Sequence, residues 1–196
     1  KRVPLTGGKM VLTADEQALE TRHLGFAISP HEECGVEEAV RLAEEHGGEV
    51  TVLTLGPAEA EEQVRDSLAN GGDRGVHLIA GDEEWDAQGT ATAIVAAVRE
   101  EEGADGPFDL IVFGNESADT GNYQVGIRVA EALGLPSLAG VKGIELGDGQ
   151  VTARRAHEHQ YQHAQQERVA RKLEQVARVF AGLLVVRQDA RATDGL

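Results

Sequence analysis

Residues 109–126, DLIVFGNESADTGNYQVG, are the stretch of this chain that indicates its fold most directly. The first six residues are mostly apolar and predict a buried strand. A polar loop that contains glycine follows, and the sequence then predicts a helix over 123–133, ended by Gly134 and Pro136. A strand, a loop and a helix in this order are typical of one unit of an α/β fold. Free N–H groups and the helix dipole meet at the start of such a helix, so the loop is a candidate anion site.

The sequence on the N-terminal side repeats this alternation. We expect, in chain order, a helix over 35–45, a strand over 49–55, a helix over 58–70, a strand over 75–80, a helix over 86–102 and a strand over 109–114. Short apolar strands that alternate with helices predict a parallel sheet with helices on both faces. Ligands of such sheets bind beyond the carboxyl ends of the strands, so we expect the site at the loops after Leu55, Ala80 and Gly114.

The composition favours one domain with an aliphatic core, because 41% of the 196 residues are hydrophobic and only 4% are aromatic. The formal net charge of −16 repels nucleic acid and anionic membrane surfaces, so we expect neither as a partner. No signal peptide or membrane-spanning run is visible, so direct membrane insertion is not expected. The single cysteine, Cys34, excludes an internal disulfide and favours a cytoplasmic location.

The polar loop before the last predicted helix has two interpretations. Asn122 and Gln124 offer side-chain donors, and Gly126 would let a phosphate approach the backbone. Alternatively, Asp119 and Asn122 only cap the helix. The spacing alone leaves nucleotide binding and simple capping equally open.

No catalytic or metal-binding pattern accompanies this loop. The sequence lacks a P-loop, a strand-linked GxGxxG and a GxSxG motif, so hydrolase and dehydrogenase functions are not supported. The acidic stretch SPHEECGVEEAVRL at 29–42 begins a helix and is best interpreted as a solvated helix face. His157, His159 and His163 have a spacing that matches no zinc pattern, so we expect no metal site.

Taken together, these segments resemble the β subunit of electron transfer flavoproteins in their order and spacing. The matching segments are KRVP (1–4), SPHEECGVEEAVRL (29–42), VTVLTLGP (50–57), SLANGGDRGVHL (67–78) and GNESADTGNYQVGIRVAEALGLP (114–136). KRVP looks like the end of the family's first strand, whose apolar body is absent before Lys1. The agreement ends after Arg155.

The resemblance implies an α/β, flavodoxin-like three-layer sandwich with a mostly parallel sheet of the adenine-nucleotide-binding type. The first strand would be truncated or supplied by another segment, so we expect a gap in the sheet. Residues 1–156 would form the nucleotide-binding α/β domain. Residues 157–196 would form a divergent segment with a helix over 157–178, a short strand over 179–187 and a disordered tail.

The resemblance also implies an electron carrier subunit rather than an enzyme. This subunit would bind AMP, or a second FAD in electron-bifurcating members, while the redox FAD is held mainly by an α subunit. Its partners would be that α subunit, flavin dehydrogenases such as the acyl-CoA dehydrogenases of fatty acid oxidation, and a membrane quinone oxidoreductase. The alternatives are a stand-alone adenine-nucleotide-binding regulatory module, like a universal stress protein, and a pseudo-subunit that binds nothing.

The family's binding positions carry over to a defined set of residues here. Asp119, Asn122, Tyr123, Gln124, Val125 and Gly126 would form the phosphate loop, Ser29, Pro30, His31 and Glu32 would approach the adenosine, and Leu55 would neighbour the base. Ser29 replaces the family's Asn, which weakens one expected hydrogen bond. Val125 stands where AMP-binding members often have Thr, which slightly favours the bifurcating type.

Overall fold

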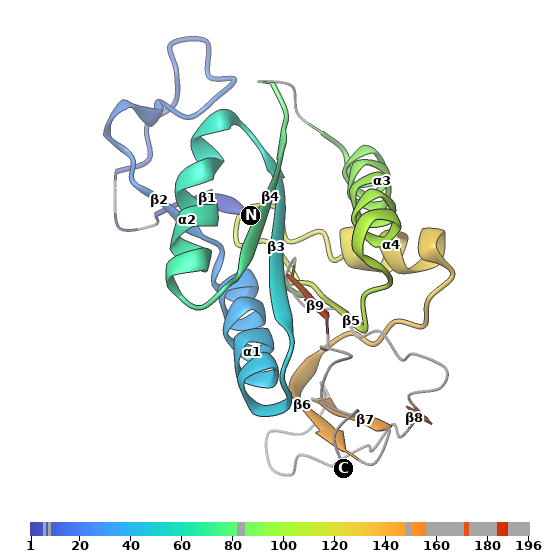
Figure 1. Cartoon of the computed structure of the whole chain (residues 1–196). Coiled ribbons are helices and arrows are strands. Elements are labelled where there is room, and N and C mark those ends of the chain that lie inside the picture. Colours follow the sequence, from blue (N-terminus) through green and yellow to red (C-terminus); the bar gives the residue numbers. More distant parts are fainter. Residues whose placement is uncertain are drawn as a thin grey trace.

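The computed structural model describes residues 1–5, 7, 9–81, 85–147, 150–155, 171–172 and 184–187 (Figure 1). In chain order the elements are β1 (Arg2–Pro4), η1 (Thr21–His23), β2 (Phe26–Ile28), α1 (Pro30–His46), β3 (Glu49–Gly56), η2 (Ala58–Ala60), α2 (Glu61–Ala69), β4 (Arg74–Ile79), α3 (Ala87–Asp105), β5 (Leu110–Val112), α4 (Val125–Leu133), β6 (Val141–Gly147), β7 (Gln150–Arg155), β8 (Arg171–Lys172) and β9 (Leu184–Arg187). The expected alternation of strands and helices is therefore confirmed, and the chain has a mixed α/β fold.

The helices differ from the expectation mainly at their ends. α1 begins at Pro30, which confirms the helix start predicted at Ser29-Pro30, because Ser29 takes the N-cap position and Pro30 the first turn. The helix thus begins five residues before the range 35–45 that its apolar pattern predicted. α4 begins at Val125 rather than at 123, because Tyr123 adopts a positive φ of 54°, which no helix residue has.

The central sheet has the strand order β4-β3-β9-β5. β3 pairs with β4 in parallel, from Thr51 opposite Arg74 to Gly56 opposite Ile79. β9 is antiparallel to both β3 and β5. β3, β4 and β5 therefore run in one direction, and their carboxyl ends lie at the same edge of the sheet.

The predicted gap in this sheet is wrong, because β9 lies between β3 and β5. This agrees with the other expectation, that another segment of the chain supplies a strand to the sheet. Val186 of β9 stands opposite both Val50 of β3 and Leu110 of β5. Two buried strands with unpaired main-chain groups need a partner between them, and a short apolar segment supplies those hydrogen bonds. β1, in contrast, pairs with β2 in a separate two-stranded antiparallel sheet.

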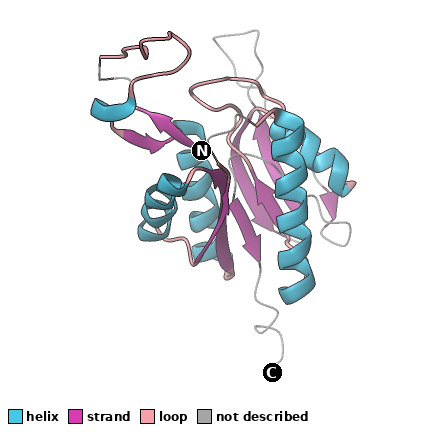
Figure 2. Ribbon diagram, turned by 90° about the horizontal axis from the view of Figure 1, so that it is seen from above, coloured by secondary structure: helices cyan, strands magenta, loops and turns pink. Residues whose placement is uncertain are grey.

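Two apolar clusters cover the two faces of the sheet, because successive side chains of a strand point to opposite faces. On one face, Leu53 and Ile111 pack against α3 and α4. On the other face, Val52 and Val112 pack against α1 and the β6–β7 hairpin. Figure 2 shows helices on both sides of the strands. This arrangement leaves the carboxyl edge of the sheet for the loops.

A hydrogen-bonded contact joins α1 to β6. The Ile144 amide donates to Glu38 Oε1 at 2.8 Å, and Arg41 Nη2 donates to the Ile144 carbonyl at 2.7 Å. Both main-chain groups of one residue are thus satisfied by side chains of one helix. The contact holds the β6–β7 hairpin against the apolar face of α1.

The C-terminal predictions fall largely outside the described residues. The expected helix over 157–178 is wrong at Arg171–Lys172, which form β8 because they pair with the main chain of β7. The expected strand over 179–187 is confirmed at Leu184–Arg187. The rest of these two segments, His157, His159, His163 and the tail over 188–196 lie outside the described residues.

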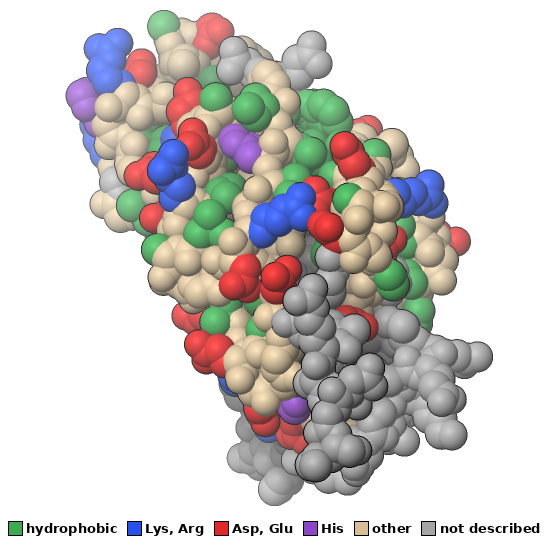
Figure 3. Space-filling model, viewed as in Figure 1, with side chains coloured by type: hydrophobic (Ala, Val, Ile, Leu, Met, Phe, Trp, Pro, Cys, Tyr) green, Lys and Arg blue, Asp and Glu red, His purple; other side chains and the backbone are tan. Residues whose placement is uncertain are grey.

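The acidic composition of the chain is visible on its described surface. Figure 3 shows acidic side chains scattered over one face, with fewer basic ones between them. None of the described helices combines the length and the hydropathy that crossing a membrane requires.

Candidate functional site

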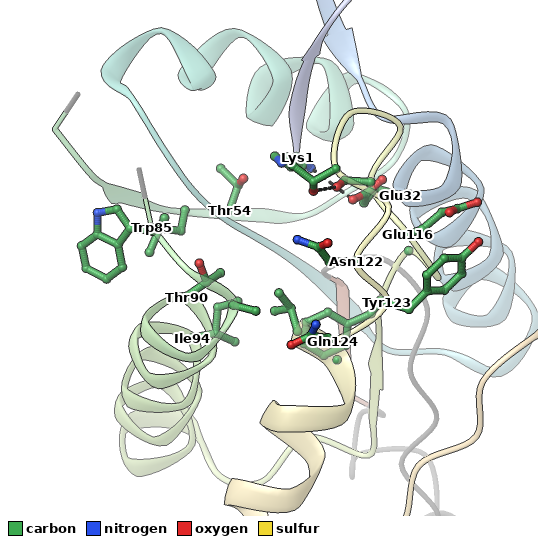
Figure 4. A pocket seen from close by; sticks show the side chains of 18 of the residues that line it. Lys1, Glu32, Thr54, Trp85, Thr90, Ile94, Glu116, Asn122, Tyr123 and Gln124 are labelled. Atoms are coloured by element: carbon green, nitrogen blue, oxygen red, sulfur yellow. Dashed lines mark hydrogen bonds and ion pairs between the residues drawn. The ribbon is translucent and has the colours of Figure 1, made fainter. Parts of the chain in front are cut away.

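A pocket of about 950 Å³ lies at the carboxyl edge of the sheet (Figure 4). It is lined by the end of β3, the segments that follow β4 and β5, and the first turns of α3 and α4. The loops after Leu55, Ala80 and Gly114, where we expected the site, all contribute to the lining. The size is in the range of small-molecule and cofactor sites in proteins.

Two helices present their N-termini to this pocket, and they differ in their capping. Asp86 caps α3, since its Oδ1 accepts a hydrogen bond of 2.6 Å from the Gly89 amide. α4 has Gln124 at its N-cap and no side-chain cap hydrogen bond. A capping carboxylate repels an anion, whereas uncapped first-turn N–H groups attract one. The start of α4 is therefore the better place for a phosphate.

The loop before α4 is held in shape by its own hydrogen bonds. The Ser117 and Thr120 hydroxyls lie 2.8 Å apart, and the Gly121 amide donates to the Ser117 carbonyl at 3.0 Å. Asp119 Oδ1 accepts from the Thr120 amide and from Lys1 Nζ, each at 2.8 Å. Asp119 thus closes the loop rather than capping α4, so the capping interpretation does not hold for this residue.

The ionisation of Asp119 follows from these contacts. Burial raises the pKa of Asp119, but hydrogen bonds from Lys1 and Ser117 outweigh burial and hold the pKa below its usual value. The carboxylate is therefore charged at neutral pH. Its charge is already paired with the Lys1 ammonium, with Nζ 2.7 Å from Oδ2.

Tyr123 carries backbone strain at the end of this loop. Its φ of 54° lies in the left-handed region, which a bulky side chain rarely adopts. Such strain is concentrated at binding and catalytic sites, because the surrounding structure must compensate for it. Tyr123 and Asn122 both line the pocket directly before α4.

Gln124 is oriented by a neighbouring cation. Arg128 donates to Gln124 Oε1 from Nη2 at 3.0 Å and to Gln88 Oε1 from Nη1 at 2.6 Å. Because Arg128 occupies Oε1, the amide nitrogen is the end of Gln124 that remains to donate to a ligand. The guanidinium also adds positive charge one turn from the start of α4.

Gly126 both packs against the sheet and lines the pocket. A Cβ at this position would lie 3.2 Å from Cγ of Phe113, so the glycine lets α4 pack closely on that ring. Gly126 and Val125 still line the pocket.

The four residues expected near an adenosine differ in burial and in whether they line the pocket. Ser29 is fully buried, and its Oγ accepts a hydrogen bond of 3.2 Å from the Ala118 amide. Pro30 and His31 are exposed and are not part of the pocket lining. Only Glu32 reaches the pocket, and Leu55 lines it from β3.

Several lining residues were not anticipated from the sequence. They are Lys1, Thr54, Trp85, Thr90, Ile94 and Glu116 (Figure 4). Thr90 and Ile94 lie in the N-terminal half of α3, and Trp85 directly precedes its N-cap residue Asp86. This end of α3 meets the same sheet edge as the start of α4. The predicted order of strands and helices could have indicated these residues, because a helix that follows a parallel strand begins at the carboxyl edge of the sheet.

The fold and the pocket define a mixed α/β protein with a candidate ligand pocket at the carboxyl ends of its aligned strands. Among the parts of the chain that the structure describes, no group of three or more His, Cys, Asp or Glu side chains is placed to hold a metal ion.

Comparison with known proteins gives the family. A family model described as "Electron transfer flavoprotein domain" matches residues 18–191. The electron transfer flavoprotein subunit beta of Bacillus subtilis is 35% identical over 132 residues, which are 66% of this chain and 49% of that protein. The chain therefore belongs to the electron transfer flavoprotein family, as a β-type subunit.

Two further relatives show how varied the similar proteins are. The acryloyl-CoA reductase electron transfer subunit gamma of Anaerotignum propionicum is 33% identical over 162 residues, covering 82% of this chain and 60% of that protein. Protein FixA of Bradyrhizobium diazoefficiens is 36% identical over 138 residues, covering 67% of this chain and 47% of that protein. The chain spans about half the length of the relatives it matches.

Proposed function

We propose that this chain binds AMP in the pocket at the carboxyl edge of its sheet and serves as the β-type subunit of a two-subunit electron carrier. The observation that carries the proposal is the uncapped N-terminus of α4 in a pocket of about 950 Å³, within a chain of the electron transfer flavoprotein family. In this assignment the chain is a carrier subunit and not an enzyme with its own catalytic residues.

The proposed arrangement assigns the phosphate to Asn122, Tyr123, Gln124, Val125 and Gly126, with Asp119 holding the loop. Gln124 donates from its amide nitrogen, and the first-turn N–H groups of α4 complete an anion site. The adenosine occupies the space between Glu32 and Leu55, while Ser29, Pro30 and His31 form the turn that places Glu32. The apolar side chains of Leu55 and Ile94 suit a flat aromatic base.

We extend the proposal to the larger fold and to the partners, with family membership as its support. The chain adopts a flavodoxin-like three-layer sandwich in which residues 1–156 form the nucleotide-binding domain and 157–196 form a divergent extension. An α subunit carries the FAD, which supplies the redox chemistry of the pair. The relative named as an acryloyl-CoA reductase electron transfer subunit supports an acyl-CoA-linked enzyme as a redox partner of the complex. The proposed electron donors are flavin dehydrogenases such as the acyl-CoA dehydrogenases. A membrane quinone oxidoreductase is the acceptor, and the complex works in the cytoplasm.

A second FAD in place of AMP is the alternative, and two observations favour it. Val125 lines the pocket at the start of α4, where AMP-binding members often have a Thr hydroxyl. The pocket also extends along α3 to Trp85 and Thr90, beyond the phosphate loop. FAD here would make the complex an electron-bifurcating one.

The test is mass spectrometry of the small molecules released when the purified chain, produced together with its α-type partner, is denatured. We expect AMP in a 1:1 ratio with this chain. A second FAD per complex would support the bifurcating alternative. Release of ATP from a chain that does not co-purify with the α subunit would contradict the carrier function and favour a regulatory module. Absence of any nucleotide would favour a pseudo-subunit.

A further inference from the structure

A second, much smaller cavity adjoins the pocket. It has a volume of about 30 Å³ and lies between α1, α2 and β3. Lys1, Glu32, Leu53 and Thr54 line both the small cavity and the large pocket, so the two spaces share one wall. A water molecule needs roughly 10–15 Å³ of such space. The small cavity therefore has room for one or two waters or for one small polar group.

Two buried oxygen atoms at this cavity lack partners. Among the described residues, Glu32 Oε2 and Gln63 Oε1 are buried without a hydrogen bond. Gln63 is only 5% exposed, and the Glu32 side chain is 13% exposed. A buried acceptor without a donor is costly, and native proteins nearly always satisfy such atoms. Both residues line the small cavity, so one group placed there would serve both.

The orientation of the Gln63 amide fixes which end faces inward. Its Nε2 lies 3.4 Å from Glu62 Oε2, a carboxylate on the same helix. Rotating the amide by half a turn would bring Oε1 against that carboxylate, which is repulsive. Gln63 and Glu32 therefore contribute an amide oxygen and a carboxylate oxygen to the lining, and both atoms only accept. Lys1 and Thr54 line the same cavity, and the Lys1 α-ammonium lies 3.9 Å from the other Glu32 oxygen, Oε1.

The position of Glu32 is set by a close contact with the end of β5. A Cβ on Gly114 would lie 2.7 Å from Glu32 Cδ and 3.0 Å from the Glu32 amide nitrogen. The missing side chain of Gly114 thus makes room for the first turn of α1 and its carboxylate. This contact keeps Glu32 at the wall that separates the pocket from the cavity.

A ligand group that faces this pair of acceptors must be a hydrogen-bond donor, whether it contacts the pair directly or through a water. A ligand N–H or O–H group satisfies the pair directly. A water in the cavity would give its two hydrogens to Glu32 and Gln63 and would then present only lone pairs to the ligand. In both cases the ligand group that faces this wall must be a hydrogen-bond donor.

We infer that Gln63 and Glu32 form an acceptor pair that selects nucleotides carrying a hydrogen-bond donor on their nucleoside part. This inference rests on the proposed nucleotide-binding function and adds the specificity of the same site. The donor is either the exocyclic amine of the base or a ribose hydroxyl. A carbonyl oxygen or an additional phosphate at this wall is repelled.

The test is isothermal titration of the full chain with AMP, IMP, 2′-deoxy-AMP and 3′-deoxy-AMP. We expect AMP to bind about tenfold more tightly than the analogue that lacks the recognised donor, since leaving a buried acceptor unpaired has a cost of this order. Weakened IMP identifies the base amine, and a weakened deoxy analogue identifies the ribose hydroxyl. Either result supports the inference.

A variant of Gln63 tests whether this residue is the source of the selectivity. Gln63→Leu removes the acceptor at similar volume and is expected to bring the ratio of affinities to within about threefold of one. Gln17→Met, in the exposed segment between β1 and η1, is the control for the loss of a glutamine at another position. If melting curves show that Gln63→Leu is unfolded, Glu32→Gln gives the same readout, because its amide replaces one acceptor oxygen with a donor.

Two results would overturn the inference while leaving the proposed function intact. One is equal binding of AMP and all three analogues by the unaltered chain. The other is full selectivity in a folded Gln63→Leu variant. If the unaltered chain binds none of the four nucleotides, the proposed function fails and the inference fails with it.

Discussion

The Ser29 hydroxyl accepts a hydrogen bond of 3.2 Å from the Ala118 amide, across 89 positions of sequence. Ser29 is the N-cap residue of α1 and is fully buried, while Ala118 lies in the loop before α4. The bond joins two segments that the sequence marked as parts of one site. Ser29 therefore acts on the pocket through the shape of this loop.

We expect Ser29→Ala to destabilise the chain by about 1–2 kcal/mol, because the Ala118 amide loses its acceptor. Hydrogen exchange should show faster exchange of the Ala118 amide and of its loop neighbours. The Val50 amide, which donates to Asp73 Oδ2 at 2.8 Å on the far side of the sheet, serves as the internal control. Unchanged exchange at Ala118 would show that the hydroxyl does not hold the loop.

Gly114→Ala is expected to destabilise the chain by about 1–3 kcal/mol, because its Cβ would lie 2.7 Å from Glu32 Cδ. The displaced Glu32 should also weaken nucleotide binding. Chemical denaturation and titration measure the two effects. Gly103→Ala in α3 is the matched control, since a Cβ at that position would have no neighbouring atom within 4 Å and the helix favours alanine. Equal stability of the two variants would contradict the close-contact argument.

Glu38 should make stability depend on pH. Burial raises the pKa of Glu38, but hydrogen bonds from Arg41 and the Ile144 amide outweigh burial and lower the pKa from its usual value of 4.5. Because the pKa of Glu38 is lower in the folded state, its ionised carboxylate stabilises the fold above pH 4.5. This stabilisation is lost as the pH falls through the pKa of Glu38 in the folded state.

The free energy of unfolding, measured between pH 7 and pH 3, should therefore fall less steeply with decreasing pH in Glu38→Gln than in the unaltered chain. Glu37→Gln, an exposed neighbour on the same helix, is the control and should leave the slope unchanged. The prediction is wrong if the two variants give the same pH dependence.

Arg128→Met is expected to weaken binding of a phosphate-bearing nucleotide about three- to tenfold, because it removes the cation beside the start of α4 and releases Gln124. The loss should shrink at high salt, since added ions screen an exposed charge. Titrations at low and high ionic strength measure this. Arg99→Met, whose guanidinium donates to the Ala132 carbonyl at 3.1 Å, is the control and should bind normally.

The sequence by itself determined the local elements and their order. The apolar runs at β3 and β5 and the glycine-ended helices after them are short-range patterns, and they appear in the structure close to the expected residues. The rule that parallel strands share a carboxyl edge then located the loops after Leu55, Ala80 and Gly114 at one pocket. The order of the motifs along the chain was also enough to indicate the family.

Only the tertiary structure decided which distant segments meet. The place of β9 between β3 and β5 depends on pairing across more than 70 positions of sequence from β5, which no local pattern encodes. Three further features also depend on the folded arrangement. A side chain caps α3 but not α4. Ser29 is buried against the loop at Ala118, and Gln63 and Glu32 line one small cavity. Local propensity specifies a helix or a strand, whereas hydrogen-bond partners and cavities arise only when the elements pack together.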